Sequence, residues 1–418
     1  MIQLVRGFRD ILPGEIERWQ EIEKTAVSLF ENFGFKEIRI PILERTELFA
    51  RSIGEDTDIV EKEMYTFADR KGELITLRPE ATASIVRSYI QHKTYAKDPV
   101  QKLYTIGPMF RRERPQKGRY RQFYQIDVEV LGDESAYVDA LLIFMLVTLF
   151  ERLLVKDVST HINSLGCSKC RPDFKAALSE FINSKSAALC SDCNRRKDRN
   201  PLRVLDCKVP KCREAMKDAP SILDSLDSDC QKHFDDLKQS LEDLNIPYII
   251  DKSLVRGLDY YTRTIFEIQS RYEGAQNAIC GGGRYDNLMK TLGGPDLPAT
   301  GFAIGFDRLA EISGLQSTDL VKRPDVFIAA LGEKSISKAL KWSCRMALEG
   351  IYAELDMSGR SLKALMKRAD RMGAGYVLII GEQELMDGSA VLRNMKTKEQ
   401  ESIGIEGIVE NLKKVLLK

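Results

Sequence analysis

The sequence has no run of apolar residues long enough to cross a membrane. A transmembrane helix needs about 18 or more consecutive apolar residues. The nearest approach, 140–150 (ALLIFMLVTLF), is much shorter and is typical of a buried helix. The first ten residues carry charges and no apolar segment, so we expect neither a secretory signal nor membrane association. Internal repeats and low-complexity tracts are also lacking.

An excess of charge of one sign is lacking too. The chain has 63 Lys and Arg against 62 Asp and Glu, a formal net charge of +1. A globally basic coat is therefore excluded, and any site for a polyanion must be a local patch. With 43% hydrophobic and 30% charged residues over 418 positions, the composition is typical of a soluble globular enzyme of two or three domains.

Neither of the common nucleotide-binding loops, GxxxxGK[ST] or GxGxxG, is present. Histidine is scarce, and its three isolated copies are interpreted as structural or surface residues. Nine cysteines in a chain without an apparent leader indicate a reducing compartment, which we expect to be the cytoplasm. Close pairs of cysteines then become metal or redox candidates rather than disulfides.

Hydrophobic periodicity predicts strands that mostly follow one another, with few alternating crossovers, which favours an α+β domain around an antiparallel sheet. Pro41 should bend its strand or place it at an edge. The expected strands are 35–44, 65–67, 73–77, 101–106, 122–130, 264–269 and 300–304. The expected helices are 15–33, 81–89, 136–154 and 306–311.

Two changes in composition and hydrophobic pattern along the chain suggest the domain limits. Residues 166–250 hold seven of the cysteines among many charged residues, so they are interpreted as an insertion within a first domain of residues 1–322. Residues 323–418 alternate strand patterns with a helix, which predicts a small separate α/β domain.

Residues 110–125 (FRRERPQKGRYRQFYQ) form the most basic motif. Between Arg111 and Arg121 there are six basic residues and one acid, Glu113. Planar guanidinium groups suit phosphate oxygens, and Tyr120 and Phe123 offer flat faces for a base. The alternative is a solvated, charged hairpin tip.

Three further motifs point to ligands. LVRGLDYYTRT (254–264) places Arg256 in an apolar frame, where it either binds a ligand or pairs with Asp259. CGGGRYDNL (280–288) either lets backbone approach a ligand closely or forms a tight turn. GFAIGFDRL (301–309) places Arg308 in the first turn of a helix, a position that an anionic ligand would explain.

Together with TLRPEAT (76–82), these motifs resemble class II aminoacyl-tRNA synthetases, and specifically the histidyl-tRNA synthetase family. LVRGLDYYTRT and CGGGRYD resemble that family's two histidine-specific motifs. FRRE…RQF and GFAIGFDRL resemble the second and third class-wide motifs, and 35–44 the first. The resemblance runs in register from residue 5 to about 410.

The resemblance implies ligation of L-histidine to tRNA(His) through histidyl-adenylate, with ATP and Mg²⁺, in a homodimer joined through the first motif. It also implies an antiparallel catalytic core and a carboxy-terminal α/β anticodon-binding domain. Arg111 and Arg256 would be catalytic, gripping the α-phosphate. ATP would contact Arg111, Glu113, Phe123 and Arg308. Histidine would contact Glu80, Thr82, Gln125, Glu129, Arg256, Tyr260, Tyr261 and Tyr285. Arg114 and Gln116 would read the acceptor end of the tRNA.

The cysteine spacing Cys167-x2-Cys170-x19-Cys190-x2-Cys193 is typical of a four-thiolate zinc site. Cys207 and Cys212 lie close enough in sequence to replace one pair, and free thiols are the alternative. The resemblance neither supports nor excludes a metal here. Four thiolates would leave no open position, so such a zinc would be structural.

Other functions remain as rivals. The regulatory subunit of ATP phosphoribosyltransferase resembles the same core, but it typically lacks the terminal domain and has eroded histidine motifs. A non-catalytic RNA-binding protein is disfavoured by the joint presence of Arg111, Glu113, Arg256 and Arg308. A synthetase for another amino acid is disfavoured by LVRGLDYYTRT.

Overall fold

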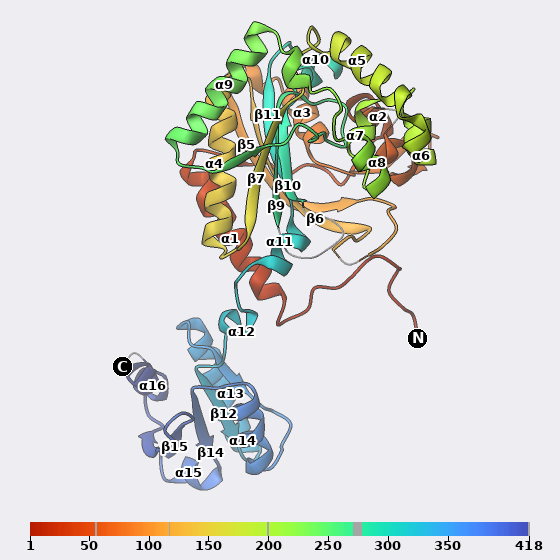
Figure 1. Ribbon diagram of the computed structural model, residues 1–418. Coiled ribbons are helices and arrows are strands. Elements are labelled where there is room, and N and C mark those ends of the chain that lie inside the picture. The colour runs from red at the N-terminus through yellow and green to blue at the C-terminus, as the bar shows by residue number, and fades with distance from the viewer. Residues whose placement is uncertain (55–56, 117, 199, 271–277, 417–418) are drawn as a thin grey trace. The chain divides into compact units, whose positions relative to one another are not determined.

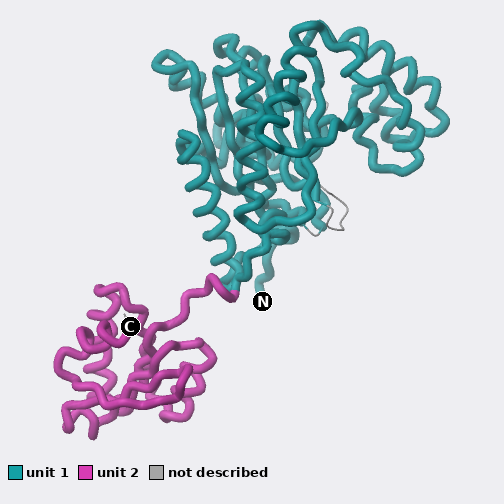
Figure 2. The backbone as a smooth tube through the Cα atoms, turned by 60° about the vertical axis from the view of Figure 1, so that its left-hand side comes forward, with its two compact units in different colours: residues 1–317 teal, residues 318–418 magenta. Residues whose placement is uncertain are grey.

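The computed structural model describes residues 1–54, 57–116, 118–198, 200–270 and 278–416, so Lys117 of the basic motif lies outside the described residues. The chain forms two compact units, Met1–Ser317 and Thr318–Lys418 (Figure 2). Among the described residues, no helix combines the length and apolar character needed to span a bilayer.

An eight-stranded sheet forms the centre of the first unit, in the order β1-β5-β6-β11-β10-β9-β7-β8. Neighbouring strands are antiparallel except for the pairs β1–β5 and β7–β8. The predicted α+β class is therefore confirmed. The strands are β1 (Lys36–Glu37), β5 (Gln101–Phe110), β6 (Gln122–Leu131), β11 (Ala299–Gly305), β10 (Ala278–Arg284), β9 (Thr262–Ser270), β7 (Val158–Ser164) and β8 (Tyr248–Ile250).

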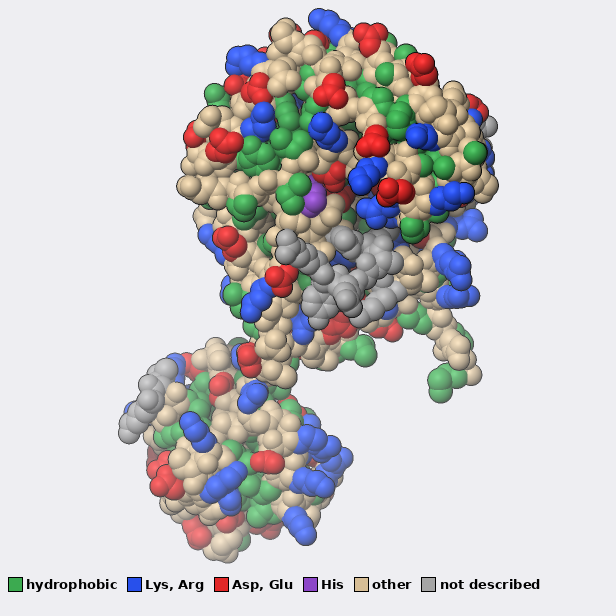
Figure 3. Space-filling view, in the orientation of Figure 1, with side chains coloured by type: hydrophobic (Ala, Val, Ile, Leu, Met, Phe, Trp, Pro, Cys, Tyr) green, Lys and Arg blue, Asp and Glu red, His purple; other side chains and the backbone are tan. Residues whose placement is uncertain are grey.

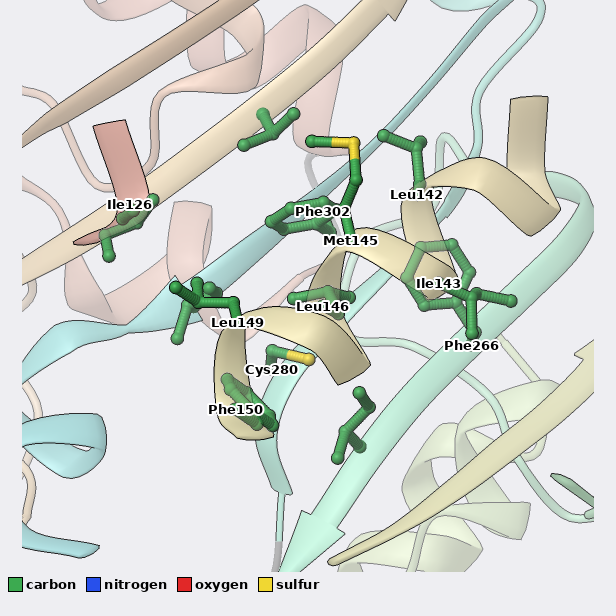
Figure 4. Close-up of a cluster of buried hydrophobic side chains, with 14 of the residues drawn as sticks. Ile126, Leu142, Ile143, Met145, Leu146, Leu149, Phe150, Phe266, Cys280 and Phe302 are labelled. Carbon is green, nitrogen blue, oxygen red and sulfur yellow. The ribbon is translucent and has the colours of Figure 1, made fainter. Parts of the chain in front are cut away.

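One side of this sheet is covered by α1 (Ile16–Asn32), α4 (Ala136–Arg152) and α9 (Ser228–Asp243) (Figure 1). The apolar run 140–150 lies inside α4, and the side chain of Ser135 caps the helix by accepting a hydrogen bond from the Tyr137 amide. Leu142, Leu146 and Leu149 of α4 pack onto strand residues that include Ile126 and Phe302 (Figure 4). This core leaves the opposite side of the sheet for polar side chains.

The segment between β1 and β5 forms a small three-stranded sheet, in the order β2-β4-β3. Its strands are β2 (Leu43–Arg45), β4 (Leu74–Leu77) and β3 (Tyr65–Ala68). The expected strand 35–44 is thus broken into β1 and the start of β2, with Pro41 in the gap, because proline cannot donate a ladder hydrogen bond. The accompanying helices are α2 (Thr46–Ile53), η1 (Ile59–Glu63), α3 (Thr82–Gln91), η2 (Thr94–Ala96), α10 (Leu288–Thr291) and α11 (Phe306–Ile312).

Short helices make up most of residues 166–250. They pack around buried cysteines together with Phe174, Leu178 and Ile182, which form a separate small core. These helices gather on the side of the sheet away from α4 and α9 (Figure 1). They are α5 (Arg171–Ser184), η3 (Ser186–Ala188), α6 (Ser191–Arg196), α7 (Leu202–Leu205), α8 (Pro210–Ala215) and η4 (Ile222–Ser225).

The second unit has its own five-stranded sheet, in the order β13-β12-β14-β15-β16. β12 pairs in parallel with β13 and β14, and the remaining pairs are antiparallel. The strands are β12 (Val326–Ala330), β13 (Ala353–Leu355), β14 (Tyr376–Ile380), β15 (Ser389–Asn394) and β16 (Gln400–Gly404). The helices are α12 (Ser317–Leu320), α13 (Glu333–Leu348), α14 (Leu362–Arg371), α15 (Glu382–Met386) and α16 (Ile408–Leu416). Basic and acidic side chains are interspersed on the faces seen in Figure 3.

The glycine-rich motif at 280–284 is not a tight turn, which was one of the two alternatives for it. It forms most of β10, which is hydrogen-bonded on both sides, to β9 and β11. Glycine has low strand propensity, and here the pairing with two neighbours overrides it. The glycines therefore form part of the central sheet.

Candidate functional site

Alternate residues of β6 build the floor of a cavity on the polar side of the sheet. Ile126 and Val128 face the hydrophobic core, so Gln125, Asp127 and Glu129 face the other way. A cavity of about 270 Å³ opens above them. Besides those three, its walls include Glu80, Thr82, Arg111, Glu113, Phe123, Arg256, Tyr260, Tyr261, Tyr285 and Arg308.

Small residues lie opposite the polar residues of β6 and leave them room. Glu129 is paired with Gly301, and Gln125 with Gly305, across the β6–β11 ladder. A Cβ at Gly301 would overlap the carboxylate of Glu129 and lie 2.5 Å from the carbonyl oxygen of Val128. Glycine is therefore required at 301 for the Glu129 side chain to lie over the sheet.

Glu129 is the centre of an acidic pocket. Thr82 Oγ1 donates to its Oε1 at 2.6 Å, and the Tyr285 hydroxyl donates to its Oε2. Nearby, the carboxylate of Glu80 accepts the backbone N–H groups of Thr82 at 2.8 Å and Ala83 at 3.0 Å, at the start of α3. The first turn of α3 therefore fixes both Glu80 and the hydroxyl that orients Glu129.

Burial makes this pocket unfavourable for its own negative charges. Desolvation raises the pKa of Asp127 and of Glu129 well above the ordinary range, and it also raises the pKa of Glu80. Asp127 Oδ2 and Gln125 Oε1 have no hydrogen-bond partner among the described residues. A ligand that brings positive charge and N–H donors would satisfy these groups.

Arg256 lies beside the acidic pocket, in the loop that precedes β9. Its Nη1 pairs with Glu267 Oε2 rather than with Asp259, so the suggested Arg256–Asp259 pair is wrong. Asp259 faces Asn200, whose Nδ2 donates to its Oδ1 at 3.1 Å. The guanidinium of Arg256 lies directly over Gly281 of β10, where a Cβ would be 2.5 Å from Nη1 and closer to Nη2 and Cζ.

A second part of the cavity wall, here called the basic end, carries Arg111, Arg119 and Arg308. Arg111 Nε donates to the carbonyl oxygen of Pro79 at 2.9 Å, and its guanidinium carbon lies 5.2 Å from the ring centroid of Phe123. Glu113 Oε2 lies 2.8 Å from Arg119 Nη1. Arg111, Glu113 and Arg119 are therefore held against the cavity wall. The alternative interpretation of the motif as a solvated, charged hairpin tip is wrong for these residues.

Arg308 completes the basic end from a different element. It is the third residue of α11, and its Nη1 donates to the carbonyl oxygen of Ala278. Burial, and then the positive charge of Arg119, lower its pKa. Two arginines held this close are stabilised by an anion placed between them.

The structure gathers all of the predicted ATP- and histidine-contacting residues around this one cavity. The two predicted tRNA contacts, Arg114 and Gln116, do not line it. They are exposed in the loop between β5 and β6, next to a short bridge between Gln116 and Arg119. They are therefore accessible to a large partner outside the cavity.

Sequence reasoning did not assign roles to Asp127 and Arg119, which line the cavity, or to Glu267, which pairs with Arg256. Asp127 could have been found, because it shares the period-two alternation of Gln125 and Glu129 along β6. Arg119 was counted only as part of a charged run. Glu267, the partner of Arg256, carries no local signal because the pairing joins residues eleven positions apart across a loop.

The structure does not bring the predicted quartet together, whereas the alternative, in which Cys207 and Cys212 replace one pair, agrees with the cluster that contains Cys190 and Cys193. The structure divides the quartet between two clusters, and each CxxC pair joins more distant partners. Cys190 and Cys193 meet Cys207 and Cys212, and Cys167 and Cys170 meet Asp227 and Cys230. Sequence spacing identified the pairs, but the packing of the short helices decides which pairs meet.

An antiparallel sheet with arginines from three segments around one cavity, followed by a separate α/β unit, is the arrangement that the resemblance to class II aminoacyl-tRNA synthetases implies. Comparison with known proteins gives the family. Residues 7–309 match the family model described as histidyl-tRNA synthetase, and residues 325–415 match an anticodon binding domain. The chain therefore belongs to the histidyl-tRNA synthetase family.

Individual relatives agree with this assignment. The chain is 61% identical to a histidine–tRNA ligase of Desulforapulum autotrophicum, over 100% of this chain and 98% of the relative. It is 60% identical to that of Desulfatibacillum aliphaticivorans, over 99% and 98%. The apo crystal structure of S. aureus histidyl-tRNA synthetase superposes with a TM-score of 0.82 at 38% identity, over 99% of this chain and 100% of that one.

Proposed function

We propose that the cavity binds L-histidine at its acidic end and ATP at its basic end, and that it joins them as histidyl-adenylate. The chain is a histidine–tRNA ligase, which charges tRNA(His) with histidine and releases AMP and pyrophosphate. The observation that carries the proposal is the position of Arg256. It lines the same cavity as the buried carboxylates on one hand and Arg111 and Arg308 on the other.

Histidine would satisfy the acidic pocket. Glu80, Thr82 and Gln125 would receive the α-ammonium group, and Glu129 with Tyr261 would bracket the imidazole. The raised pKa values of Glu80 and Glu129 support this role, because buried carboxyl groups gain most from a cationic, hydrogen-donating ligand.

Three tyrosines frame the imidazole site. Tyr260 and Tyr285 have ring centroids 5.5 Å apart in an edge arrangement, and Tyr260 lies 4.8 Å from Tyr261. A site that hydrogen-bonds a polar ring leaves its own groups unpaired around an apolar mimic, so discrimination of about 10⁴–10⁵ needs no editing step.

ATP, as its magnesium complex, would occupy the basic end. Arg111 would grip the α-phosphate, and the base would stack on Phe123 with Arg308 on its other face, reaching the γ-phosphate. Glu113 would accept the adenine amino group. Glu113 is paired with Arg119 in the structure, so a contact with the adenine amino group would redirect that carboxylate.

The chemistry needs no nucleophile from the protein. A carboxylate oxygen of the bound histidine attacks the α-phosphorus, the new P–O bond forms, and pyrophosphate leaves with the electron pair. Arg256 and Arg111 would stabilise the charge that develops on the α-phosphoryl oxygens. Holding both substrates over one sheet makes the step effectively unimolecular.

Transfer to tRNA would use parts of the chain outside the cavity. Arg114 and Gln116, exposed in the β5–β6 loop, would contact the acceptor end, including its extra 5′ guanosine. The second unit, which matches an anticodon binding domain, would contact the anticodon. Its presence also argues against the regulatory-subunit alternative.

We further propose a homodimer joined through the segment around 35–44. Leu43 and Phe67 support this, because both lie on one face of the small sheet and remain 43% and 47% exposed. Apolar side chains left open on a sheet face are typical of an interface. The cytoplasmic location stays a prediction.

The experiment is exchange of labelled pyrophosphate into ATP, run with each standard amino acid in turn. Exchange should require histidine and should nearly vanish in Arg256→Ala, while the thermal unfolding midpoint stays close to that of the parent protein. Exchange with a different amino acid, or full exchange by Arg256→Ala, would overturn the proposal.

A further inference from the structure

We propose that residues 166–250 hold two structural zinc ions. One would be bound by four thiolates and the other by three thiolates and one carboxylate, and together they would stabilise the loop that carries Arg256. The first set is Cys190, Cys193, Cys207 and Cys212, and the second is Cys167, Cys170, Asp227 and Cys230. In each set the candidate ligand atoms all lie within 4.8 Å of one another.

The sulfur separations fit a metal. Zinc–sulfur bonds are about 2.3 Å long, so two sulfurs of a tetrahedral site lie about 3.8 Å apart. Cys190 and Cys207 are 3.9 Å apart at Sγ, and Cys167 and Cys170 are 3.7 Å apart. A disulfide requires about 2.05 Å, so these are not bonded pairs.

Backbone groups are already arranged to support thiolates. The N–H of Cys190 donates to Cys212 Sγ at 3.1 Å, and the N–H of Lys169 donates to Cys167 Sγ at 3.3 Å. The N–H of Asp227 donates to Cys170 Sγ at 3.3 Å. Such hydrogen bonds around the ligands are the usual supporting shell of a structural metal.

The second carboxylate oxygen of Asp227 faces the thiols of the second set, where it accepts a hydrogen bond from Cys167 Sγ. Asp227 Oδ1 accepts the N–H of Cys230 at 2.8 Å and so caps α9, while its Oδ2 lies 3.2 Å from Cys167 Sγ. One carboxylate can therefore cap a helix and ligate an ion at the same time. A set of three sulfurs and one oxygen is within the range of zinc sites, and four protein ligands leave no open position for catalysis.

The surrounding structure explains why metals would be needed. The helices α6, α7 and α8 have only six, four and six residues, far below the length at which isolated helices are stable. Their core is small and has cysteine side chains at its centre. A metal that joins distant segments supplies stability that such a core cannot.

Close in sequence to the ligands of each cluster lies an arginine that contacts the loop 254–261. Arg171 follows Cys170 directly, and its Nη2 donates to the carbonyl oxygen of Tyr261. Arg203 lies between the two ligand pairs of the first cluster, and its Nη2 donates to the carbonyl oxygen of Gly257. Loss of metal would free these two arginines, and the loop would lose its support.

Metal analysis of the full-length protein, purified under reducing conditions without chelator, tests the sites directly. We expect about two zinc ions per chain. One ion, none, or iron in place of zinc would overturn the proposal. Exchange of the bound zinc for Co²⁺ should give the strong visible absorption of tetrahedral thiolate sites, and absence of this absorption after the exchange would also count against the proposal.

Variants separate the two sites. Cys207→Ser and Cys230→Ser should each lose one zinc, whereas Cys344→Ser, a change at an exposed cysteine of the second unit, should keep both. Asp227→Asn keeps a capping oxygen, so it should fold but release the second ion faster to a chelator. Equal release from Asp227→Asn and the parent protein would exclude the carboxylate as a ligand.

The effect on the loop rests on the proposed function and is measured separately. Removing zinc with a chelator should raise the KM for histidine by about tenfold, more than the KM for ATP, and added zinc should restore it. An unchanged KM would refute the support of the loop but not the metal sites. Absence of histidine-dependent exchange in the zinc-loaded protein would instead refute the proposed function.

Discussion

Replacing Gly281 with alanine should disable Arg256 without unfolding the chain. The new Cβ would lie 2.5 Å from Arg256 Nη1 and closer to Nη2 and Cζ, whereas ordinary van der Waals contacts begin at about 3.4 Å. The guanidinium would therefore have to move by about 1 Å or more, away from the floor of the cavity. Because the obstructing atoms are the end of a flexible side chain, the backbone need not shift.

A displacement of 1 Å at a group that positions reacting atoms costs about 10²-fold in rate, or about 2.7 kcal/mol of transition-state stabilisation. We therefore expect kcat/KM for histidine-dependent pyrophosphate exchange to fall by about two orders of magnitude. The thermal unfolding midpoint should remain within a few degrees of the parent value.

Gly404→Ala provides the matched control, since this glycine also lies in a strand but has no atom within 4 Å of an added Cβ. It should leave both exchange and stability unchanged. Near-normal exchange by Gly281→Ala would refute the reasoning, because Arg256 could then act from a different position. A large loss of stability would show that the strand, and not the arginine, responds to the methyl group.

Three other predictions concern neighbouring groups. Gly282→Ala should lower the unfolding midpoint, measured by calorimetry, because its Cβ would be 2.5 Å from Phe266 Cζ and closer still to a backbone oxygen; a midpoint equal to that of Gly281→Ala would contradict this. The pKa of Glu129 is raised well above its ordinary range of about 4.3. As pH falls through that raised value the carboxylate is protonated, so the KM for histidine should begin to rise at a higher pH than a free carboxyl group would cause. Glu129→Gln should bind histidine more weakly at neutral pH and should lack this dependence, and the difference between the two profiles cancels the titration of histidine itself. Arg114→Ala should retain pyrophosphate exchange but lower the rate of tRNA charging about tenfold or more, and equal losses in both assays would show that this residue also serves adenylate formation.

Much of the fold follows from local patterns. The strand at 122–130 and the helix at 136–154 were expected within one or two residues of β6 and α4, because periodicity and capping act over short distances. β10 was not expected as a strand. Its glycines carry no strand signal, and only pairing with β9 and β11 makes them one.

The site residues likewise fall into those that the sequence could predict and those that it could not. A motif indicated Arg256 and the family resemblance implied Glu129, but neither indicated that Glu267 neutralises the first or that burial raises the pKa of the second. Such properties depend on contacts between distant segments. The same holds for the cysteines. A CxxC pair can be recognised in the sequence, but the residues that it meets, including Asp227, depend on how the helices pack.

The central claim is that one cavity holds histidine and the nucleotide on either side of Arg256. A crystal structure with a non-hydrolysable histidyl-adenylate analogue tests it most directly. We expect the imidazole against Glu129, the phosphoryl group between Arg256 and Arg111, and the adenine between Phe123 and Arg308. An analogue bound elsewhere, or a guanidinium of Arg256 turned away from it, would contradict the account.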